Sequence, residues 1–255
     1  MLSVIVSGKA APGCTASVWA LALGWPVPVL VVDADAAGGD MAAGLLAGRV
    51  RVDRSLLSWS VAARRVPALD AASMLGQHAV ALPEAPRVWL MAGFQNAAQA
   101  SALDAGGWER LSRALEREGS VADRDVLVDA GRLTDASCWP VIRSANRVLL
   151  TTRRTLRSVH AARNAAAVLR ARLGDLSSVS LLVIGSGPYA AAAIAREIGV
   201  PVAGELPEDR AAAAVLSDGA ADGLRGVHRS KLVKAAGGVA RQLMSAPAMT
   251  VRASR

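Results

Sequence analysis

The feature that most constrains the fold of this chain is a series of short apolar runs rich in valine, isoleucine and leucine. A strand with one face in water alternates apolar and polar residues, whereas a strand covered on both faces is apolar throughout. Most of these runs are continuous, so they predict a parallel sheet covered by helices on both sides. The predicted strands are Leu2–Val6, Val27–Val32, Val88–Met91, Asp125–Asp129, Arg147–Thr151, Val179–Ile184 and Val200–Leu206.

Segments with helical spacing lie between these runs. The predicted helices are Thr15–Leu23, Trp108–Glu118, Leu156–Leu173, Tyr189–Ile198 and Lys231–Met244, the last interrupted by Gly237-Gly238. The alternation of strand and helix is typical of a doubly wound α/β fold with a mostly parallel sheet. We expect residues 1–245 to form one such domain, with a flexible tail over residues 246–255. Residues 45–86 look helical but carry few other signals.

The chain is strongly basic, with 29 Lys and Arg against 21 Asp and Glu and a net charge of +8. Two explanations stay open: contact with an anionic partner such as nucleic acid, or a GC-rich coding bias that favours alanine and arginine. The lysines are few, namely Lys9, Lys231 and Lys234. The arginines concentrate in two acid-free stretches, one over residues 143–172 and one from residue 225 onward, which either bind an anionic surface or face solvent.

Several classes of protein are excluded by the composition. Cys14 and Cys138 form no CxxC and the three histidines show no ligand spacing, which excludes a disulfide scaffold and a cysteine or histidine metal site. The longest apolar run, Val18–Val32, contains a glycine and two prolines and is too short and too broken to span a bilayer. The N-terminus lacks the charged region and cleavage site of a signal peptide. We therefore expect a cytoplasmic protein.

The segment after the first predicted strand has the features of a phosphate-binding loop. Gly8 and Gly13 occupy the two glycine positions of the pattern G-x-x-x-x-G-K-[ST], and Thr15 stands where a hydroxyl would bind Mg²⁺. Such a loop needs a strand, a turn lined with backbone N–H groups, and a helix N-terminus directed at the anion. The lysine position of the pattern holds Cys14, whose neutral thiol cannot make the charge-assisted contact of a lysine with phosphate.

The loop resembles the deviant loop K-G-G-x-G-K-[ST] of the MinD/ParA family of P-loop ATPases, and here it reads K-A-A-P-G-C-T. On this resemblance Lys9 is the signature lysine of the family and Thr15 is a Mg²⁺ ligand. Ala10 and Ala11 replace two glycines of the family and narrow the room for backbone to approach phosphate. The resemblance assigns nucleotide contacts to Gly8, Lys9, Ala10, Ala11, Pro12, Gly13, Cys14, Thr15 and Ala16.

Two further segments resemble family motifs that end in acidic residues. The segment VLVVDADAAGGD resembles the family's second motif, so that Asp35 is expected to position the attacking water and Asp33 to order the Mg²⁺ shell. The segment DVLVDAGRL resembles a Walker B strand, which makes Asp129 a Mg²⁺ ligand. Open α/β sheets place their sites at the carboxyl ends of strands, and we expect these acids there.

The later part of the chain resembles the family in the same order. The family usually carries an adenine-reading asparagine after the strand at 181–184, whereas this chain has Gly185 or Ser186 there, so adenine recognition is weakened or moved. The LPED segment at 206–209 resembles a turn that lies beside the base, which makes Pro207 a nucleotide contact. No G-x-G-x-x-G follows the first predicted strand, which argues against the rival α/β interpretation, a Rossmann oxidoreductase.

The resemblance implies a switch protein that binds ATP and Mg²⁺, forms a homodimer around the nucleotide, and positions a septum, a chromosome, or pilus or secretion machinery. Lys9 would reach across the dimer to the phosphates of the partner. Hydrolysis would rest on positioning and electrostatic stabilisation, and the missing lysine at Cys14 predicts that it is weak or slow.

Two alternatives stay open from the sequence. One is a non-catalytic pseudo-ATPase scaffold of the CpaE/TadZ or septum-site type, which would localise pilus or secretion machinery through a protein partner. The other is a partition component that binds DNA without sequence preference through Arg153, Arg154 and Arg157. The docking surface would be a protein, the nucleoid, or the periphery of the inner membrane.

Overall fold

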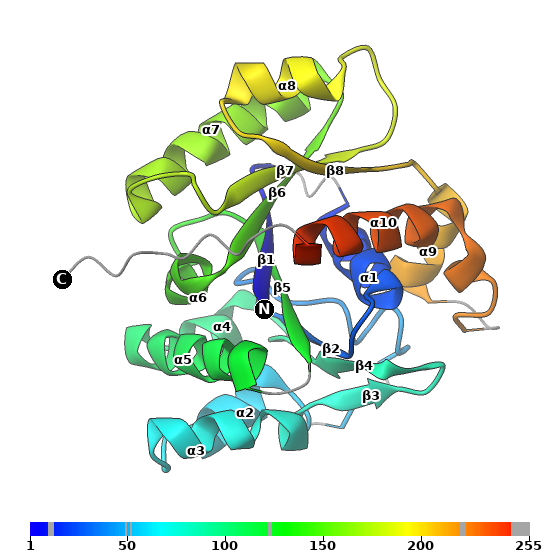
Figure 1. Cartoon of the computed structure of the whole chain (residues 1–255). Helices are drawn as coiled ribbons and strands as arrows, with labels where there is room; N and C mark the ends of the chain where they lie inside the picture. The colour runs from blue at the N-terminus through cyan, green and yellow to red at the C-terminus, as the bar shows by residue number, and fades with distance from the viewer. Residues whose placement is uncertain (10–12, 49, 52, 122–123, 220–222, 246–255) are drawn as a thin grey trace.

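The computed structural model describes residues 1–9, 13–48, 50–51, 53–121, 124–219 and 223–245. Its strands are β1 (Leu2–Ser7), β2 (Val29–Asp33), β3 (Val80–Leu82), β4 (Ala85–Met91), β5 (Asp125–Arg132), β6 (Arg147–Arg153), β7 (Val179–Ile184) and β8 (Val202–Leu206). They form one sheet in the order β3-β4-β2-β5-β1-β6-β7-β8 (Figure 1). All neighbours are parallel except the β3–β4 pair at one edge, which confirms the predicted mostly parallel sheet.

Helices cover both faces of this sheet (Figure 1). One face carries α1 (Cys14–Gly24), α9 (Arg210–Asp218) and α10 (Lys231–Ser245). The other face carries α2 (Leu56–Ala63), α3 (Ala68–Ser73), α5 (Ala105–Val121), α6 (Trp139–Ser144), α7 (Leu156–Leu173) and α8 (Ala191–Ile198). The short α4 (Ala97–Ser101) and 3-10 turns at Leu75–His78 and Val227–Arg229 complete the described elements. Within the described part of the chain, no helix has the length and apolar character needed to cross a membrane.

The central strands are buried on both faces, which explains their continuous apolar sequences. In β1, Val4 and Val6 pack toward α5 to α8, whereas Ile5 points to the opposite face and packs with α1 and α10. All three side chains are fully buried. Because successive residues of a strand face opposite sides, a strand between two helix layers favours apolar residues on both of its faces.

The structure adds elements that the sequence pattern did not show. The edge strand β3 pairs antiparallel with β4, and α2 and α3 form within residues 45–86, where helix was expected without boundaries. Three further helices that were not predicted, α4, α6 and α9, are short. Short elements carry too few residues for their periodicity to stand out from the surrounding chain.

The last helix corrects one expectation. α10 runs through Gly237 and Gly238 without interruption, and Gly237 lies against Gly24 at the end of α1. A Cβ on Gly24 would stand 2.7 Å from the backbone nitrogen of Gly237, so the two helices approach backbone to backbone. The apolar side of α10, which includes Leu232 and Leu243, is buried in the core. That side is therefore not available for docking on a membrane or a partner.

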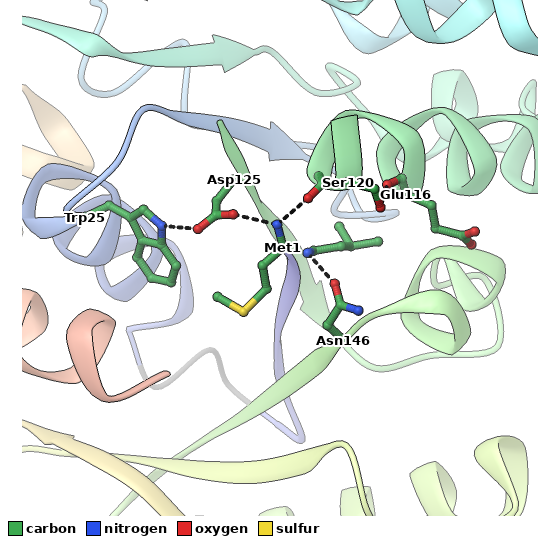
Figure 2. Close-up of polar contacts among 8 residues, drawn as sticks. Met1, Trp25, Glu116, Ser120, Asp125 and Asn146 are labelled. Atoms are coloured by element: carbon green, nitrogen blue, oxygen red, sulfur yellow. Dashed lines mark hydrogen bonds and ion pairs between the residues drawn. The ribbon is translucent and has the colours of Figure 1, made fainter. Parts of the chain in front are cut away.

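A polar network fixes the amino end of the sheet (Figure 2). Asp125, at the start of β5, accepts hydrogen bonds from the Met1 ammonium at 2.5 Å and from the Trp25 indole N–H at 2.8 Å. The Leu2 backbone N–H donates to the Asn146 side chain at 2.7 Å. These contacts join β1, β5 and the segment after α1, and they lie at the opposite end of the strands from the acids described next.

Candidate functional site

The carboxyl ends of β1, β2 and β5 meet at one edge of the sheet. Asp33 in β2 is in register with Asp129 in β5, and β1 pairs with β5 on its other side. The chain leaves β1 at Ser7, and α1 begins at Cys14. This arrangement brings the predicted phosphate loop next to the predicted acids, at the carboxyl ends of the strands, where open α/β sheets place their sites.

Glycines shape both ends of the loop. A Cβ on Gly8 would overlap the Ala161 carbonyl of α7, so this residue lets the start of the loop pack directly on that helix. Gly13 has a φ of 81°, in the left-handed region that glycine adopts without strain. It directly precedes α1, and its carbonyl accepts a hydrogen bond from the Ser17 hydroxyl at 2.7 Å. The predicted contacts Ala10, Ala11 and Pro12 lie outside the described residues.

The first turn of α1 is linked to β5 through Asp129. The Thr15 hydroxyl donates to Oδ2 of Asp129 at 2.7 Å, and the Cys14 thiol donates to Oδ1 at 3.3 Å. The backbone N–H of Gly131 also donates to Oδ1, at 2.9 Å. Burial raises the pKa of Asp129, and these three hydrogen bonds act in the opposite direction. Thr15 and Asp129 are thus adjacent, as two ligands of one Mg²⁺ must be.

Asp33 is as deeply buried as Asp129. Its carboxylate accepts a hydrogen bond from the Met41 N–H at 3.3 Å and is crowded by Gly39 and Gly93, where any Cβ would overlap it or press on it. Burial, reinforced by the charge of Asp129, raises the pKa of Asp33 well above its ordinary value. Asp33 is therefore a second carboxyl near the Thr15–Asp129 pair, and its ionised form destabilises the folded chain.

Asp35 lies beyond the end of β2 and is half-buried. It accepts a hydrogen bond from the Ala37 N–H at 2.8 Å, and burial raises the pKa of this carboxyl. Gly131, with a φ of 59°, packs so closely that a Cβ there would overlap the Asp35 carboxylate. The sequence analysis assigned no role to Gly131. The signal available there was a glycine two residues after Asp129 in the same strand.

Cys14 is buried, and its thiol faces Asp129. Burial, together with the charge of Asp129, raises the pKa of Cys14 well above its ordinary value, so the side chain is a neutral thiol. A neutral thiol is a poor nucleophile and a poor ligand for Mg²⁺. The position that usually supplies a cation to phosphates therefore supplies none here.

The donor set fits Mg²⁺ only in combination with a further ligand. Mg²⁺ prefers oxygen ligands and is usually held by one or two protein oxygens together with substrate phosphates and waters. Thr15 Oγ1 and Asp129 Oδ2 are such oxygens, and Asp33 is close enough to influence them electrostatically. Among the described residues, no group of three or more His, Cys, Asp and Glu side chains could hold a metal ion by itself.

Lys9 is exposed, next to Gly8, and it lines a hollow of about 700 Å³ that also borders α7. Lys9 thus lies at the exposed rim of the loop, whereas Asp129 and Cys14 are buried. Ala16 is half-buried in the first turn of α1.

Pro207 follows β8, on the other side of the loop from the acids. The Gly185 N–H donates to the Leu206 carbonyl at 2.8 Å, which holds the ends of β7 and β8 together. A Cβ on Gly13 would stand 4.0 Å from the Ile184 side chain, so the loop abuts the end of β7. Pro207 thus follows the strand at the edge of the sheet, and its contact with a base stays a prediction.

Arg154 has a structural role that the sequence did not reveal. Its guanidinium donates to the carbonyls of Gly185 and Tyr189, each at 3.0 Å, and it pairs with Glu205. These contacts fix the segment that follows β7 against the end of β6 and against β8. Arg154 is thus engaged within the fold, and neutralising it as a test of DNA binding would disturb the structure. Arg153 and Arg157 remain suitable for that test.

The raised carboxyl pKa values give a prediction for stability. Folded Asp33 keeps its proton to higher pH than the unfolded chain, so ionising it lowers stability as pH rises above the ordinary pKa of 3.8. Asp33→Asn should therefore raise the free energy of unfolding at pH 8 by about 1 kcal/mol or more, because each unit of pKa shift is worth about 1.4 kcal/mol. At pH 5 the gain should be smaller. Denaturant unfolding at both pH values measures it.

Asp53→Asn is the matched control for this experiment. Asp53 is exposed and pairs with Arg51, and its pKa is lowered rather than raised. The control should show no gain in stability with rising pH. An Asp33→Asn chain less stable than the parent at pH 8 would contradict the account of a buried, costly carboxylate.

Comparisons with known proteins identify the fold. No protein-family model matches the chain, and no curated protein does. Among solved structures, a ParA family ATPase from Chlorobium tepidum matches with a TM-score of 0.72 and 20% identity over 94% of this chain and 98% of that one. A chain of the Aquifex aeolicus MinC:MinD cell division complex matches with a TM-score of 0.74 and 18% identity, over 96% of each chain. MinD from Pyrococcus horikoshii, complexed with Mg-ADP, matches with a TM-score of 0.68 and 17% identity, over 96% of this chain and 97% of that one. The chain thus has the P-loop fold of the MinD and ParA ATPases.

Proposed function

We propose that this chain is a nucleotide-dependent switch that binds ATP and Mg²⁺ at residues 8–16 and forms a homodimer around the nucleotide. The dimer would position a cellular assembly such as a septum, a chromosome, or pilus or secretion machinery. The observation that carries this proposal is the Thr15–Asp129 hydrogen bond, which joins the first turn of α1 to the end of β5. A hydroxyl and a carboxylate at this place suit Mg²⁺ bound together with phosphate oxygens.

Different groups of the chain would bind the phosphates, Mg²⁺ and the attacking water. Backbone N–H groups at the start of α1 would bind phosphate, since the N-terminus of a helix is a site for anions. Thr15 and Asp129 would hold Mg²⁺, which when bound neutralises negative charge on the phosphates. Asp33 would accept hydrogen bonds from waters of the Mg²⁺ shell. Asp35, half-buried and oriented by the Ala37 N–H, would position the attacking water.

We expect turnover to be slow because Cys14 brings no positive charge to the phosphates. Phosphoryl transfer depends on positioning and on stabilising charge in the transition state, and a neutral thiol contributes nothing to the second. Hydrolysis at the rate of an ATPase with an intact lysine would contradict this expectation.

Dimer formation tests the switch directly. Lys9 is exposed at the rim of the loop, and in the proposed dimer its ammonium would bind the phosphates of the second copy. Light scattering should show the mass of the chain rising toward a dimer when ATP and Mg²⁺ are added. Lys9→Ala should lose most of this rise, whereas Lys234→Ala, at an exposed position of α10, should keep it. A chain that binds ATP and stays monomeric would contradict the switch.

A non-catalytic scaffold is the second candidate function. The neutral, buried Cys14 favours it, as does Gly185, which offers no amide side chain to read a base. A scaffold would dimerise or bind its partner equally well with and without nucleotide, so the same light-scattering experiment separates the two.

A further inference from the structure

A hollow of about 430 Å³ lies between the end of α2 and the start of α5. The two helices contact each other and lie on the same side of the sheet (Figure 1). Among the described residues, the hollow shares no lining residue with the phosphate loop or with the hollow that Lys9 borders. Its volume is in the lower part of the range of small-molecule sites, which is about 300–1,000 Å³. It therefore has the size of a site for a small ligand.

Two arginines line this hollow from different walls. Arg64 directly follows α2, and its guanidinium donates to the Ala102 carbonyl at 2.8 Å. Arg110 lies in α5, and its guanidinium donates to the Val66 carbonyl, also at 2.8 Å. Each side chain is thus held by backbone of the opposite wall. A guanidinium carries five N–H groups, so each arginine keeps further donors for a ligand.

The hollow has more positive than negative charge. Asp104 is the acid among its described lining residues, and its Oδ1 already accepts a hydrogen bond from the Gly107 N–H at 2.8 Å. Within the described part of the chain, Arg64 and Arg110 bond to carbonyls and to no carboxylate. The hollow therefore offers two guanidinium groups against one carboxylate that is already engaged.

The rest of the lining suits a ligand that also has an organic part. Trp59 and Leu103 are buried and give the hollow an apolar floor. Gly106 lies in the first turn of α5, where backbone N–H groups have no partner within the helix and favour an anion. Cations on two walls and an apolar floor together indicate an anion attached to a small apolar group.

We propose that this hollow binds a small organic phosphate monoester. Its two negative charges would match Arg64 and Arg110, and its terminal oxygens would accept hydrogen bonds from both planar guanidinium groups. Its organic part would lie on Trp59 and Leu103. A carboxylate fits less well, because it brings one charge to two guanidinium groups and a single bidentate arginine satisfies it. The proposal does not depend on nucleotide binding at residues 8–16.

Calorimetric titration of the full chain tests the class of ligand. Phenyl phosphate is the probe, and benzoate is its counterpart with one charge and a carboxylate. At pH 8, phenyl phosphate should bind with a Kd below about 1 mM and at least about tenfold more tightly than benzoate. Benzoate bound as tightly as phenyl phosphate, or a folded chain that does not bind phenyl phosphate, would overturn the proposal.

Arginine variants test whether the phosphate binds in the hollow. Arg64→Ala should weaken the binding of phenyl phosphate at least about tenfold, because it removes a charge-assisted hydrogen-bond donor. Arg65→Ala, at an exposed position outside the hollow, should leave the binding unchanged. Equal losses in the two variants would reduce the effect to net charge. An Arg64→Ala chain that binds as the parent does would place the phosphate elsewhere, such as at residues 8–16. Either result contradicts the proposal.

Gly106→Glu tests the same hollow with both arginines in place. A Cβ on Gly106 would meet the Asp104 Oδ1 at 3.6 Å, an ordinary contact, so the position has room for a side chain. The new carboxylate would compete with phosphate for the guanidinium groups, whereas Gly106→Gln adds nearly the same volume without charge. The glutamate variant should bind phenyl phosphate at least about tenfold more weakly than the glutamine variant, with circular dichroism showing both folded. Equal binding by these two variants would also overturn the proposal.

Discussion

Replacing Cys14 with lysine is expected to tighten ATP–Mg²⁺ binding and to accelerate hydrolysis, each by about tenfold or more. The thiol lies 3.3 Å from the Asp129 carboxylate, at the start of α1. A lysine ammonium there would offset the acids Asp33 and Asp129 and would reach the phosphates with a charge-assisted hydrogen bond. Such a bond contributes about 1.5–3 kcal/mol, which is about tenfold to a hundredfold in an equilibrium constant. Calorimetry and phosphate release measure the two effects.

Cys14→Met separates charge from size in this experiment. Methionine has a similar reach and no charge, so it should leave both affinity and turnover at or below those of the parent chain. An equal gain with methionine, or no gain with lysine, would show that the loop is not built around the phosphates as we propose.

Gly24→Ala is expected to lower the free energy of unfolding by about 2–3 kcal/mol, in the range of overpacking in a dense interior. The added Cβ would stand 2.7 Å from the Gly237 nitrogen and 3.0 Å from the Val233 carbonyl, both backbone atoms of α10. Backbone atoms cannot turn aside as a flexible side chain can, so α1 and α10 must separate. Urea unfolding measures the change.

Gly238→Ala is the control for this contact. It makes the same chemical change in the same helix pair, but a Cβ at Gly238 meets no atom within 4 Å. In a helix, alanine is favoured over glycine by up to about 1 kcal/mol, so this variant should be as stable as the parent chain or more stable. Equal losses from both variants would contradict the close packing of α1 and α10.

The sequence predicted the parts of the fold that repeat a strong pattern. β2 is buried on both faces, and Val29–Val32 therefore reads as an unbroken apolar run, whereas α7 was long enough to carry its own periodicity. The acids could be placed because Asp33 ends β2 and Asp129 lies near the end of β5, and parallel strands bring their carboxyl ends to one edge. The remaining support for a resemblance to the MinD/ParA family came from the order of these elements along the chain.

Features that depend on tertiary contacts could not be predicted. Gly131 lies in β5 and Asp35 follows β2, so their close approach joins segments far apart in the sequence. No local sequence pattern predicts such a contact. Arg154 looked like one more cation of a basic surface until its bonds to the carbonyls after β7 were visible. The pair Gly237-Gly238 looked like a helix break because the sequence does not show that Gly24 packs against it.

Calorimetric titration of the full chain with ATP, with and without Mg²⁺, tests the central claim most directly. The account predicts micromolar binding that requires Mg²⁺ and that is lost when Thr15→Val or Asp129→Asn removes one of the two oxygens placed at 2.7 Å from each other. Cys138→Ser, at a buried cysteine outside the loop, should bind as the parent does. An absence of ATP binding by the folded parent chain, or binding that is indifferent to Mg²⁺ and to Thr15, would contradict it.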